Sequence, residues 1–221
     1  MELREILRRV DHTLLRPDAR WDEIRTVCDE AARFGTASVC LPPSFVTRAA
    51  AYLDGRVPVC TVIGFPNGYA ATAVKCFEAA DAVAHGADEV DMVVNLGWVK
   101  DGRWDDILRE LRAVRACTDG KVLKVIVETC LLTDGEKRTL CDLVGRSGAD
   151  FIKTSTGFSS GGATVADVSL LAACRPPHLK IKAAGGIRTV ADAEALIAAG
   201  ADRLGTSRLV ALAKAAGEVA P

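Results

Sequence analysis

Two lysines of this sequence stand where an ammonium group is costly to bury. Lys153 closes the apolar run ADFIK and precedes the small residues TSTG, and Lys182 closes LKIK ahead of AAGG. Burying a charged amine without a partner is unfavourable, so each lysine needs either an acid beside it or a chemical role. A lysine with a free amine can attack a carbonyl carbon and form a Schiff base, which arginine cannot do. The pattern therefore leaves two hypotheses open, covalent catalysis and a plain ion pair inside the fold.

These two lysines fall at the ends of consecutive predicted strands. Neighbouring strands lie about 4.8 Å apart, so we expect the two side chains to meet. The pKa of a lysine starts near about 10.4 and must fall by about three units before much free amine exists at neutral pH. A second ammonium nearby and the loss of water both lower that pKa. The predicted pairing would let one lysine activate the other.

Acidic side chains occupy a third apolar run, EVDMVVN. Glu89 and Asp91 share one face of this predicted strand, because side chains alternate along a strand. A carboxylate within reach of the two lysines either shuttles protons or neutralises them. Lys124 and Glu128 also share a strand face, and we expect them to extend an interior polar network or to have a purely structural role.

Two glycine-bearing segments late in the chain suggest a phosphate site. Gly185 and Gly186 follow one predicted strand and open a helix, and residues 205–207 (GTS) do the same after the next strand. Backbone amides at the starts of helices bind phosphate, and the loops after strands seven and eight of a barrel often hold it. The alternative is that these glycines only shape turns.

The elements that must position these residues alternate between two periods. Short β-branched runs are separated by stretches whose apolar residues have helical spacing, and the runs are residues 11–15, 37–41, 57–65, 89–95, 121–129, 149–155, 179–184 and 201–207. Such alternation indicates βαβ units and a parallel sheet. We expect an α/β protein, a (β/α)8 TIM barrel with a short N-terminal helix, forming one domain over residues 1–221. A doubly wound open sheet is the alternative, and the absence of GxGxxG counts against its dinucleotide-binding form.

Weak internal repeats support this arrangement. Gly-Ala-Asp occurs three times between a predicted helix and a predicted strand, with its glycine at Gly86, Gly148 and Gly200. Glycine suits the left-handed conformation that ends a helix. Thr-Val-Ala-Asp occurs twice, and Thr164 and Thr189 are expected to cap helices with an acid three residues further on.

The composition excludes several classes of protein. The 221 residues carry 28 basic and 29 acidic side chains, a formal net charge of −1 that gives no electrostatic footprint for nucleic acid. The longest uncharged stretch, residues 57–74, contains Pro58 and Pro66, so we do not expect it to span a membrane. The charged first ten residues do not fit a secretory signal, and we expect a cytoplasmic protein.

Cysteine and histidine give no metal signal. The eight cysteines are scattered and include no CxxC pair, so we expect them to be reduced. The three histidines never stand at ligand spacing, and no metal site is predicted.

The motifs around these residues resemble those of deoxyribose-phosphate aldolase. The similar segments are DHT near the start, EVDMVVNLG around Asp91, FIKTSTGF around Lys153 and IKAAGGIRT around Lys182, in the same order over nearly the whole chain. The resemblance implies a TIM barrel that performs class I, metal-independent aldol chemistry without an organic cofactor. It implies reversible cleavage of 2-deoxy-D-ribose 5-phosphate to D-glyceraldehyde 3-phosphate and acetaldehyde. Its members act on small phosphosugars and aldehydes, not on nucleic acid or membranes, and homodimers are common among them.

The resemblance also assigns roles. Lys153 resembles the Schiff-base nucleophile, Lys182 the lysine that lowers its pKa and joins proton transfer, and Asp91 the proton relay. The residues that it places along the sugar are Asp11, Thr13 and Cys40. Those that it places around the phosphate are Gly157, Gly185, Gly186 and Ser207.

Two departures from the family pattern stand out. The C-terminal segment AAGEVAP has no tyrosine, whereas some members end in a mobile tail with an aromatic residue at the active site. Arg208 stands where some members have a second serine. Two rival functions also remain: a phosphosugar isomerase or epimerase, which would not need Lys153 as nucleophile, and a catalytically silent sugar-phosphate-binding barrel, which could lose the lysines.

Overall fold

A closed ring of parallel strands forms the centre of the molecule. A computed structural model describes residues 1–118 and 120–217, and within them eight strands pair in sequence order, with the first also pairing with the last. The strands are β1 Val10–Thr13, β2 Ser38–Leu41, β3 Val59–Ile63, β4 Glu89–Val93, β5 Val122–Ile126, β6 Phe151–Lys153, β7 Lys180–Ala184 and β8 Arg203–Thr206. Each lies inside a predicted run, except that β1 begins one residue earlier. The predicted TIM barrel is confirmed, and the open sheet is excluded.

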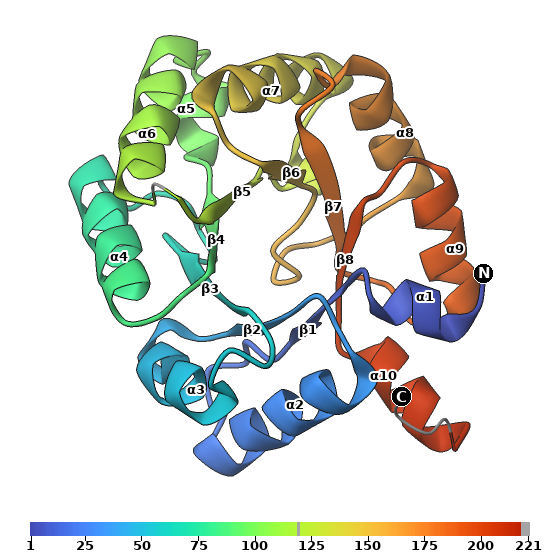
Figure 1. Cartoon of the computed structure of the whole chain (residues 1–221). Helices are drawn as coiled ribbons and strands as arrows, with labels where there is room; N and C mark the ends of the chain where they lie inside the picture. Colours follow the sequence, from blue (N-terminus) through green and yellow to red (C-terminus); the bar gives the residue numbers. More distant parts are fainter. Residues whose placement is uncertain (119, 218–221) are drawn as a thin grey trace.

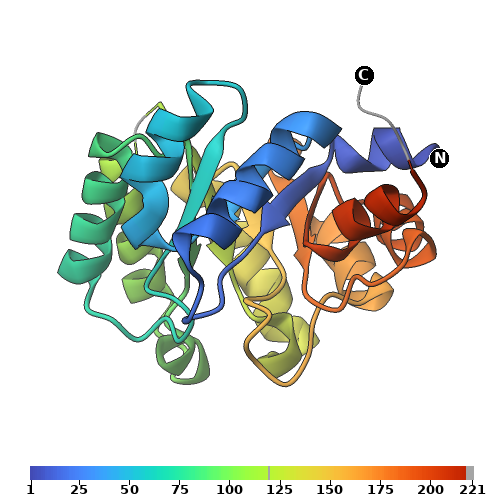
Figure 2. The ribbon, with the colours of Figure 1, turned by 90° about the horizontal axis from the view of Figure 1, so that it is seen from below.

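Helices surround this ring, as Figure 1 shows along the barrel axis and Figure 2 from the side. They are α1 Leu3–Leu7, α2 Trp21–Phe34, α3 Val46–Leu53, α4 Thr72–Ala84, α5 Leu96–Lys100, α6 Trp104–Cys117, α7 Asp134–Ser147, α8 Val165–Cys174, α9 Val190–Ala198 and α10 Arg208–Ala215, with 3-10 turns η1 Pro43–Phe45 and η2 Thr129–Leu131. None of the helices in the described ranges has the length and apolar character needed to cross a membrane. The short N-terminal helix expected from the sequence is α1, which contacts α9 and α10.

Local signals explain where several helices begin. The hydroxyls of Thr164 and Thr189 accept hydrogen bonds from the backbone N–H of Asp167 and Asp192, so both predicted caps are confirmed. Thr133 caps α7 in the same way, and the Glu136 carboxylate accepts the Thr133 backbone N–H in return. Such caps satisfy N–H groups that have no partner within the helix.

The apolar core lies between the strands and the helices. Alternate strand residues such as Val90, Met92, Leu123 and Val125 are fully buried in one large cluster with the inner faces of the surrounding helices. The remaining strand side chains point into the ring. Since β4 is buried along its whole length, the charged residues between its apolar ones must lie in the barrel interior.

The strand register brings the candidate residues together. Asp91 pairs with Lys124 across β4 and β5, and Lys153 pairs with Lys182 across β6 and β7. Both pairs lie inside one closed ring, so side chains from strands far apart in sequence converge.

Candidate active site

Two lysines and one aspartate meet inside the carboxyl half of the barrel. The Nζ atoms of Lys153 and Lys182 lie 2.8 and 2.7 Å from the same oxygen, Oδ2 of Asp91. Lys153 is the last residue of β6, and the ladder continues past it because the Thr154 N–H donates to the Lys182 carbonyl at 3.0 Å. The structure therefore brings together the three residues that the sequence predicted as catalytic.

A layer of further charges lies around this group. Lys124 is fully buried and contacts Glu89 at 2.5 Å and Oδ1 of Asp91 at 2.8 Å. Lys182 also lies 2.5 Å from Oδ2 of Asp11. Arg203 bridges Asp11 and Glu89 from β8. The cluster thus contains four cationic side chains (Lys124, Lys153, Lys182, Arg203) and three carboxylates (Asp11, Glu89, Asp91).

These contacts fix the charge state of the interior. Burial alone would raise the pKa of Asp91, but Lys124, Lys153 and Lys182 hold it well below its usual value. Burial alone would lower the pKa of Lys182, but Asp11 and Asp91 raise it above its usual value. Lys182 therefore remains an ammonium and Asp91 a carboxylate across the physiological pH range.

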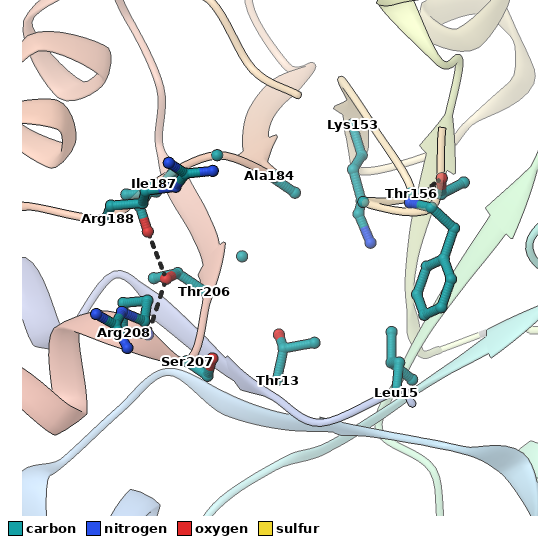
Figure 3. A pocket seen from close by; sticks show the side chains of 15 residues that line it. Thr13, Leu15, Lys153, Thr156, Ala184, Ile187, Arg188, Thr206, Ser207 and Arg208 are labelled. Carbon is teal, nitrogen blue, oxygen red and sulfur yellow. Dashed lines mark hydrogen bonds between the residues drawn. The ribbon is translucent and has the colours of Figure 1, made fainter. Parts of the chain in front are cut away.

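A cavity of about 310 Å³ opens above the cluster. Figure 3 shows the Lys153 side chain reaching into it, with Thr13 and Ser207 on other sides of the space. The cavity lining comprises Thr13, Leu15, Lys153, Thr156, Gly157, Phe158, Ala184, Gly185, Gly186, Ile187, Arg188, Gly205, Thr206, Ser207 and Arg208. Most of these residues follow β6, β7 and β8, the position where barrel enzymes hold phosphate.

The loops after β7 and β8 meet at one end of this cavity. The Thr206 hydroxyl donates to the Ile187 carbonyl at 3.1 Å and accepts the Arg208 N–H at 3.1 Å, and both bonds appear in Figure 3. Ser207 forms no side-chain hydrogen bond to the start of α10. Its hydroxyl and the glycine-bearing backbone after β7 are therefore placed where an anion could bind.

One part of the phosphate prediction needs correction. The start of α9 does not face the cavity as a free anion site, because the Asp192 carboxylate already accepts the backbone N–H groups of Arg188 and Thr189. The glycines precede that helix by several residues and do not open it. The available backbone donors on this side are those of the Gly185–Gly186 segment itself, where both residues have φ of 80°.

Close backbone packing explains the need for glycine here. A Cβ on Gly162 would lie 2.4 Å from the carbonyl carbon and oxygen of Gly185. The N–H of Ala163, next to it, donates to the carbonyls of Ala184 and Gly185. The loop after β6 is thereby fastened to the loop after β7, and together they enclose the cavity.

Two residues expected along the sugar are not part of the lining of this cavity. Asp11 and Cys40 are fully buried beneath the cavity and do not line it, whereas Thr13 does. Asp11 instead binds Arg203, Ser38 and Lys182. Its place in the ring makes it a charge partner of Lys182 in this structure. Gly157, Gly185, Gly186 and Ser207 line the cavity as expected.

Two groups of ligating atoms cluster in the same interior. Cys40, Cys60 and Asp91 converge, and Asp11, Cys60 and Glu89 form a second group. Within the described part of the chain, however, the Lys124 ammonium already contacts Glu89, Asp91 and the Cys60 sulfur. An ammonium group at these atoms opposes a second cation there, so the donor set does not fit a metal ion.

Sequence reasoning missed several residues of the site. Arg203 completes the charge cluster, and Thr156 and Phe158 form one wall of the cavity. Glu128 was expected to share a strand face with Lys124 and to extend the interior network or to have a purely structural role, but β5 ends at Ile126 and Glu128 binds that wall from behind. Arg203 shares strand parity with Gly205, so its interior position could have been found from alternation. The role of Glu128 follows from a contact between loops, for which the sequence carries no spacing signal.

A (β/α)8 barrel that presents a lysine amine to a cavity at the carboxyl ends of its strands is a TIM-barrel enzyme by fold and site. The family model described as DeoC/LacD family aldolase matches residues 6–214. The chain belongs to this family of aldolases.

Curated relatives share more than half of the residues. Proteins named deoxyribose-phosphate aldolase from Streptococcus pyogenes serotype M4 and Streptococcus agalactiae serotype Ia are each 55% identical over 214 residues, 97% of this chain and 96% of theirs. The similarity therefore spans the whole barrel and every candidate site residue between Asp11 and Ser207.

Solved structures agree with this assignment. The aldolase QR15 superposes with a TM-score of 0.92 at 38% identity, covering 97% of this chain and 96% of that one. The tetrameric deoxyribose phosphate aldolase from Aeropyrum pernix gives 0.90 at 34% identity, with coverage of 98% and 93%. The departure noted in the tail concerns a segment whose last residues, 218–221, lie outside the described residues.

Proposed function

We propose that this chain reversibly cleaves 2-deoxy-D-ribose 5-phosphate to D-glyceraldehyde 3-phosphate and acetaldehyde through a Schiff base on Lys153. The reaction belongs to the breakdown of deoxyribose phosphate. The names of the curated relatives support the substrate, and the cavity volume of about 310 Å³ falls within the range of small-molecule sites.

One observation carries the choice of nucleophile. Among the four cations of the cluster, all within the described residues, Lys153 alone lines the cavity. Lys124 and Lys182 are fully buried beneath it. A substrate carbonyl in the cavity therefore meets the Lys153 amine first.

Charge balance supports the same choice. The cluster has one more cation than carboxylates, so the loss of a single proton makes it neutral. Lys153 contacts only Asp91, whereas Lys182 contacts Asp11 as well and Lys124 also contacts Glu89. Lys153 is consequently the cation of the cluster with the fewest ion pairs.

The reaction begins at the aldehyde carbon, C1, of the open-chain sugar. The free amine of Lys153 adds to C1 and gives a carbinolamine. Protonation of the carbinolamine hydroxyl expels water and leaves an iminium ion. The positive nitrogen then serves as the electron sink for the next step.

Carbon–carbon cleavage follows from this iminium. Loss of the proton from the C3 hydroxyl breaks the C2–C3 bond, and the electron pair moves to C2 and on to the nitrogen as an enamine. D-glyceraldehyde 3-phosphate leaves with C3 to C5. Protonation of C2 and hydrolysis of the iminium release acetaldehyde and restore the amine.

In this scheme Asp91 transfers protons and Lys182 supplies a fixed positive charge. Oδ2 of Asp91 touches both amines, so it can pass a proton between the Lys153 nitrogen, a water molecule and the substrate hydroxyl. Because its pKa is held low, Asp91 passes a proton on and does not retain it. Lys182 stays charged and opposes a second positive charge at Lys153. The scheme requires no metal or organic cofactor.

The phosphate of the substrate is assigned to the far end of the cavity. We propose that backbone N–H groups near Gly157, Gly185 and Gly186, with the Ser207 hydroxyl, bind it. Arg188 and Arg208 line the same end and add positive charge. This places the phosphate away from Lys153 and the aldehyde carbon beside it.

We also propose that the active form is a homo-oligomer. The relative from Aeropyrum pernix is described as a tetramer. Light scattering of the purified protein tests this proposal, and a monomer at working concentration contradicts it.

Borohydride trapping tests the proposed mechanism. Incubation with acetaldehyde and borohydride should add an N-ethyl group to Lys153, whereas Lys182 should stay unmodified. The Lys153→Ala variant, treated in parallel, is the control for labelling elsewhere. A label on Lys182, or none on the active protein, contradicts the mechanism. A phosphosugar isomerase or a silent binding barrel would gain no label.

A further inference from the structure

A buried glutamate outside the charge cluster has no role in the chemistry described above. Glu128 follows β5, is only 2% exposed and adopts a left-handed backbone conformation with φ of 56°. Five other carboxylates in the described ranges are buried, and each forms an ion pair: Asp11, Glu89, Asp91, Glu110 and Asp167. Glu128 forms none. A buried carboxylate without a cation needs strong hydrogen bonds to remain charged.

All of the strong contacts of this carboxylate go to one residue. The Thr156 hydroxyl donates to Oε2 of Glu128 at 2.5 Å, and the Thr156 backbone N–H lies 3.2 and 3.3 Å from its two oxygens. The Thr156 hydroxyl in turn accepts the Phe158 N–H at 3.0 Å. One carboxylate thereby fixes both the backbone and the side chain of the segment Thr156–Phe158.

This segment forms a wall of the reaction cavity. Thr156, Gly157 and Phe158 all line it, and Thr156 lies three residues after Lys153. Figure 3 shows Lys153 and Thr156 on neighbouring parts of the cavity boundary. Beyond Thr156, the ring of Phe158 packs edge-to-face on Phe65 with ring centroids 5.3 Å apart. The wall is therefore held at two points, by a carboxylate behind it and by an aromatic contact at its tip.

A further cavity behind the segment Thr156–Phe158 explains why the bond to Glu128 is needed. A second cavity of about 120 Å³ lies behind the wall and is lined by Glu128, Thr156, Phe158 and Ser159, among others. Thr156 and Phe158 border both cavities. Without the Glu128 carboxylate, the segment Thr156–Phe158 has room to move into this second cavity and to lose its contact with the sugar.

We propose that Glu128 is a positioning residue for the aldol reaction, which acts by holding Thr156 and its neighbours against the substrate. This inference rests on the proposed function, because it concerns binding of the same sugar phosphate. Glu128 contacts neither the reacting carbons nor the Lys153 amine. Its effect should therefore fall on large substrates that reach the wall and spare the two-carbon aldehyde.

The left-handed backbone conformation of Glu128 guides the choice of variants. Asparagine and glycine adopt the left-handed conformation more readily than glutamate. Glu128→Asn therefore relieves backbone strain while its shorter side chain no longer reaches Thr156. Glu128→Gln keeps the length but replaces one accepting oxygen with an NH2 group. Glu136→Gln is the control, because Glu136 binds the backbone N–H and hydroxyl of Thr133 in the same way, with an added ion pair to Lys100, and does not line either cavity.

Two rates measured on each variant test the inference. For Glu128→Gln and Glu128→Asn we expect kcat/KM for 2-deoxyribose 5-phosphate to fall about tenfold, the effect of losing a hydrogen bond to a charged group. The rate of acetaldehyde trapping by borohydride should stay within about twofold of the parent, because Lys153 is untouched. Glu136→Gln should change neither rate. Equal losses in both rates, or no loss in the sugar reaction, overturn the inference.

A double-mutant cycle tests the route through Thr156. Thr156→Val removes the hydroxyl, and Thr156→Ser retains it and should lose less activity than Thr156→Val. In the Thr156→Val background, Glu128→Gln should cost at most about threefold, since the main bond is already gone. The same tenfold cost in both backgrounds overturns the route. Failure of the parent protein to cleave the sugar phosphate would instead refute the proposed function, so the two failures are distinguishable.

Discussion

Lys153 and Lys182 are paired across β6 and β7, and their amines contact one shared carboxylate oxygen on Asp91. The two side chains nevertheless differ in access, since Lys153 lines the cavity and Lys182 is sealed beneath it. Chemically equivalent groups thereby acquire different roles: one is available to a carbonyl, and the other supplies a fixed positive charge.

Lys153→Arg should be as inactive as Lys153→Ala. Arginine keeps the positive charge and can still contact Asp91, but it cannot form an imine. We expect turnover to fall by about 10⁴-fold or more in both variants, as for loss of other covalent nucleophiles. A steady-state assay with 2-deoxyribose 5-phosphate measures this. Near-normal turnover of the arginine variant would show that catalysis is not covalent.

Lys182→Leu should move the pH dependence of imine formation upward. Without Lys182, Oδ2 of Asp91 contacts Lys153 alone, and the repulsion between the two ammonium groups is lost. We expect this upward shift of the profile together with a large fall in turnover at neutral pH. Borohydride trapping of acetaldehyde across a pH series measures the shift, and circular dichroism checks the fold. An unchanged profile would mean that the charge of Lys182 does not affect imine formation.

Asp91→Asn should separate imine formation from cleavage. The amide keeps the size of the side chain and can still accept a hydrogen bond, but it cannot pass a proton. Sugar cleavage should fall by about 100-fold or more, the scale of general acid–base catalysis, while trapped imine is still detected. Cleavage at the full rate would limit Asp91 to a structural role.

Ser207→Asp should lower activity toward the phosphorylated sugar more than toward the unphosphorylated one. A carboxylate placed about 4 Å from a phosphate oxygen is repelled by about 4 kcal/mol at intermediate dielectric. After relaxation we expect kcat/KM for 2-deoxyribose 5-phosphate to fall about 10- to 100-fold. Unphosphorylated 2-deoxyribose should be nearly unaffected. Equal losses for both sugars would remove the phosphate site from this loop.

Glu30→Gln should reduce the dependence of the free energy of unfolding on pH below neutrality. A hydrogen bond to His12, joined by Lys214, holds the pKa of Glu30 at about 2 in the folded protein, below the ordinary 4.5. A lowered carboxylate pKa stabilises the fold above the unfolded value and loses that effect as pH falls toward 2. The partly exposed carboxylate is screened by solvent, so we expect a contribution of about 1 kcal/mol at neutral pH. Urea unfolding between pH 2 and 7 measures it, and a curve parallel to the parent's would contradict the prediction.

The strands and the candidate catalytic residues could both be predicted from the sequence because of the pattern of apolar and polar residues. Strand side chains alternate, so a polar residue between apolar ones in a buried run must face the interior, and this rule placed Asp91 there. Lys153 and Lys182 were placed beside each other because they close neighbouring predicted strands. Thr164 and Thr189 were found as caps because a hydroxyl with an acid three residues on is a local signal.

The level of a side chain along the barrel axis could not be predicted from the sequence pattern. The resemblance placed Asp11 along the sugar but gave no level along the barrel axis, because the tilt and stagger of the strands fix that level only when the ring closes. Asp11 therefore lies below the cavity that it was expected to line. The bond from Thr156 to Glu128 joins two loops through side-chain geometry, which no periodic pattern encodes.

Closure of the ring also sets the order in which the protein acquires its charges. Asp11 lies on the first strand and Arg203 on the last, 192 positions apart, and the two form an ion pair. A ribosome delivers Asp11 early, when Arg203 and Lys182 have not yet been translated. An uncompensated carboxylate favours water over an apolar interior, so burial of Asp11 in the barrel depends on the cations that later strands supply, Lys124, Lys182 and Arg203. The interior network is complete only in a chain synthesised through residue 203, and the reactive amine therefore gains its full electrostatic setting at the end of biosynthesis.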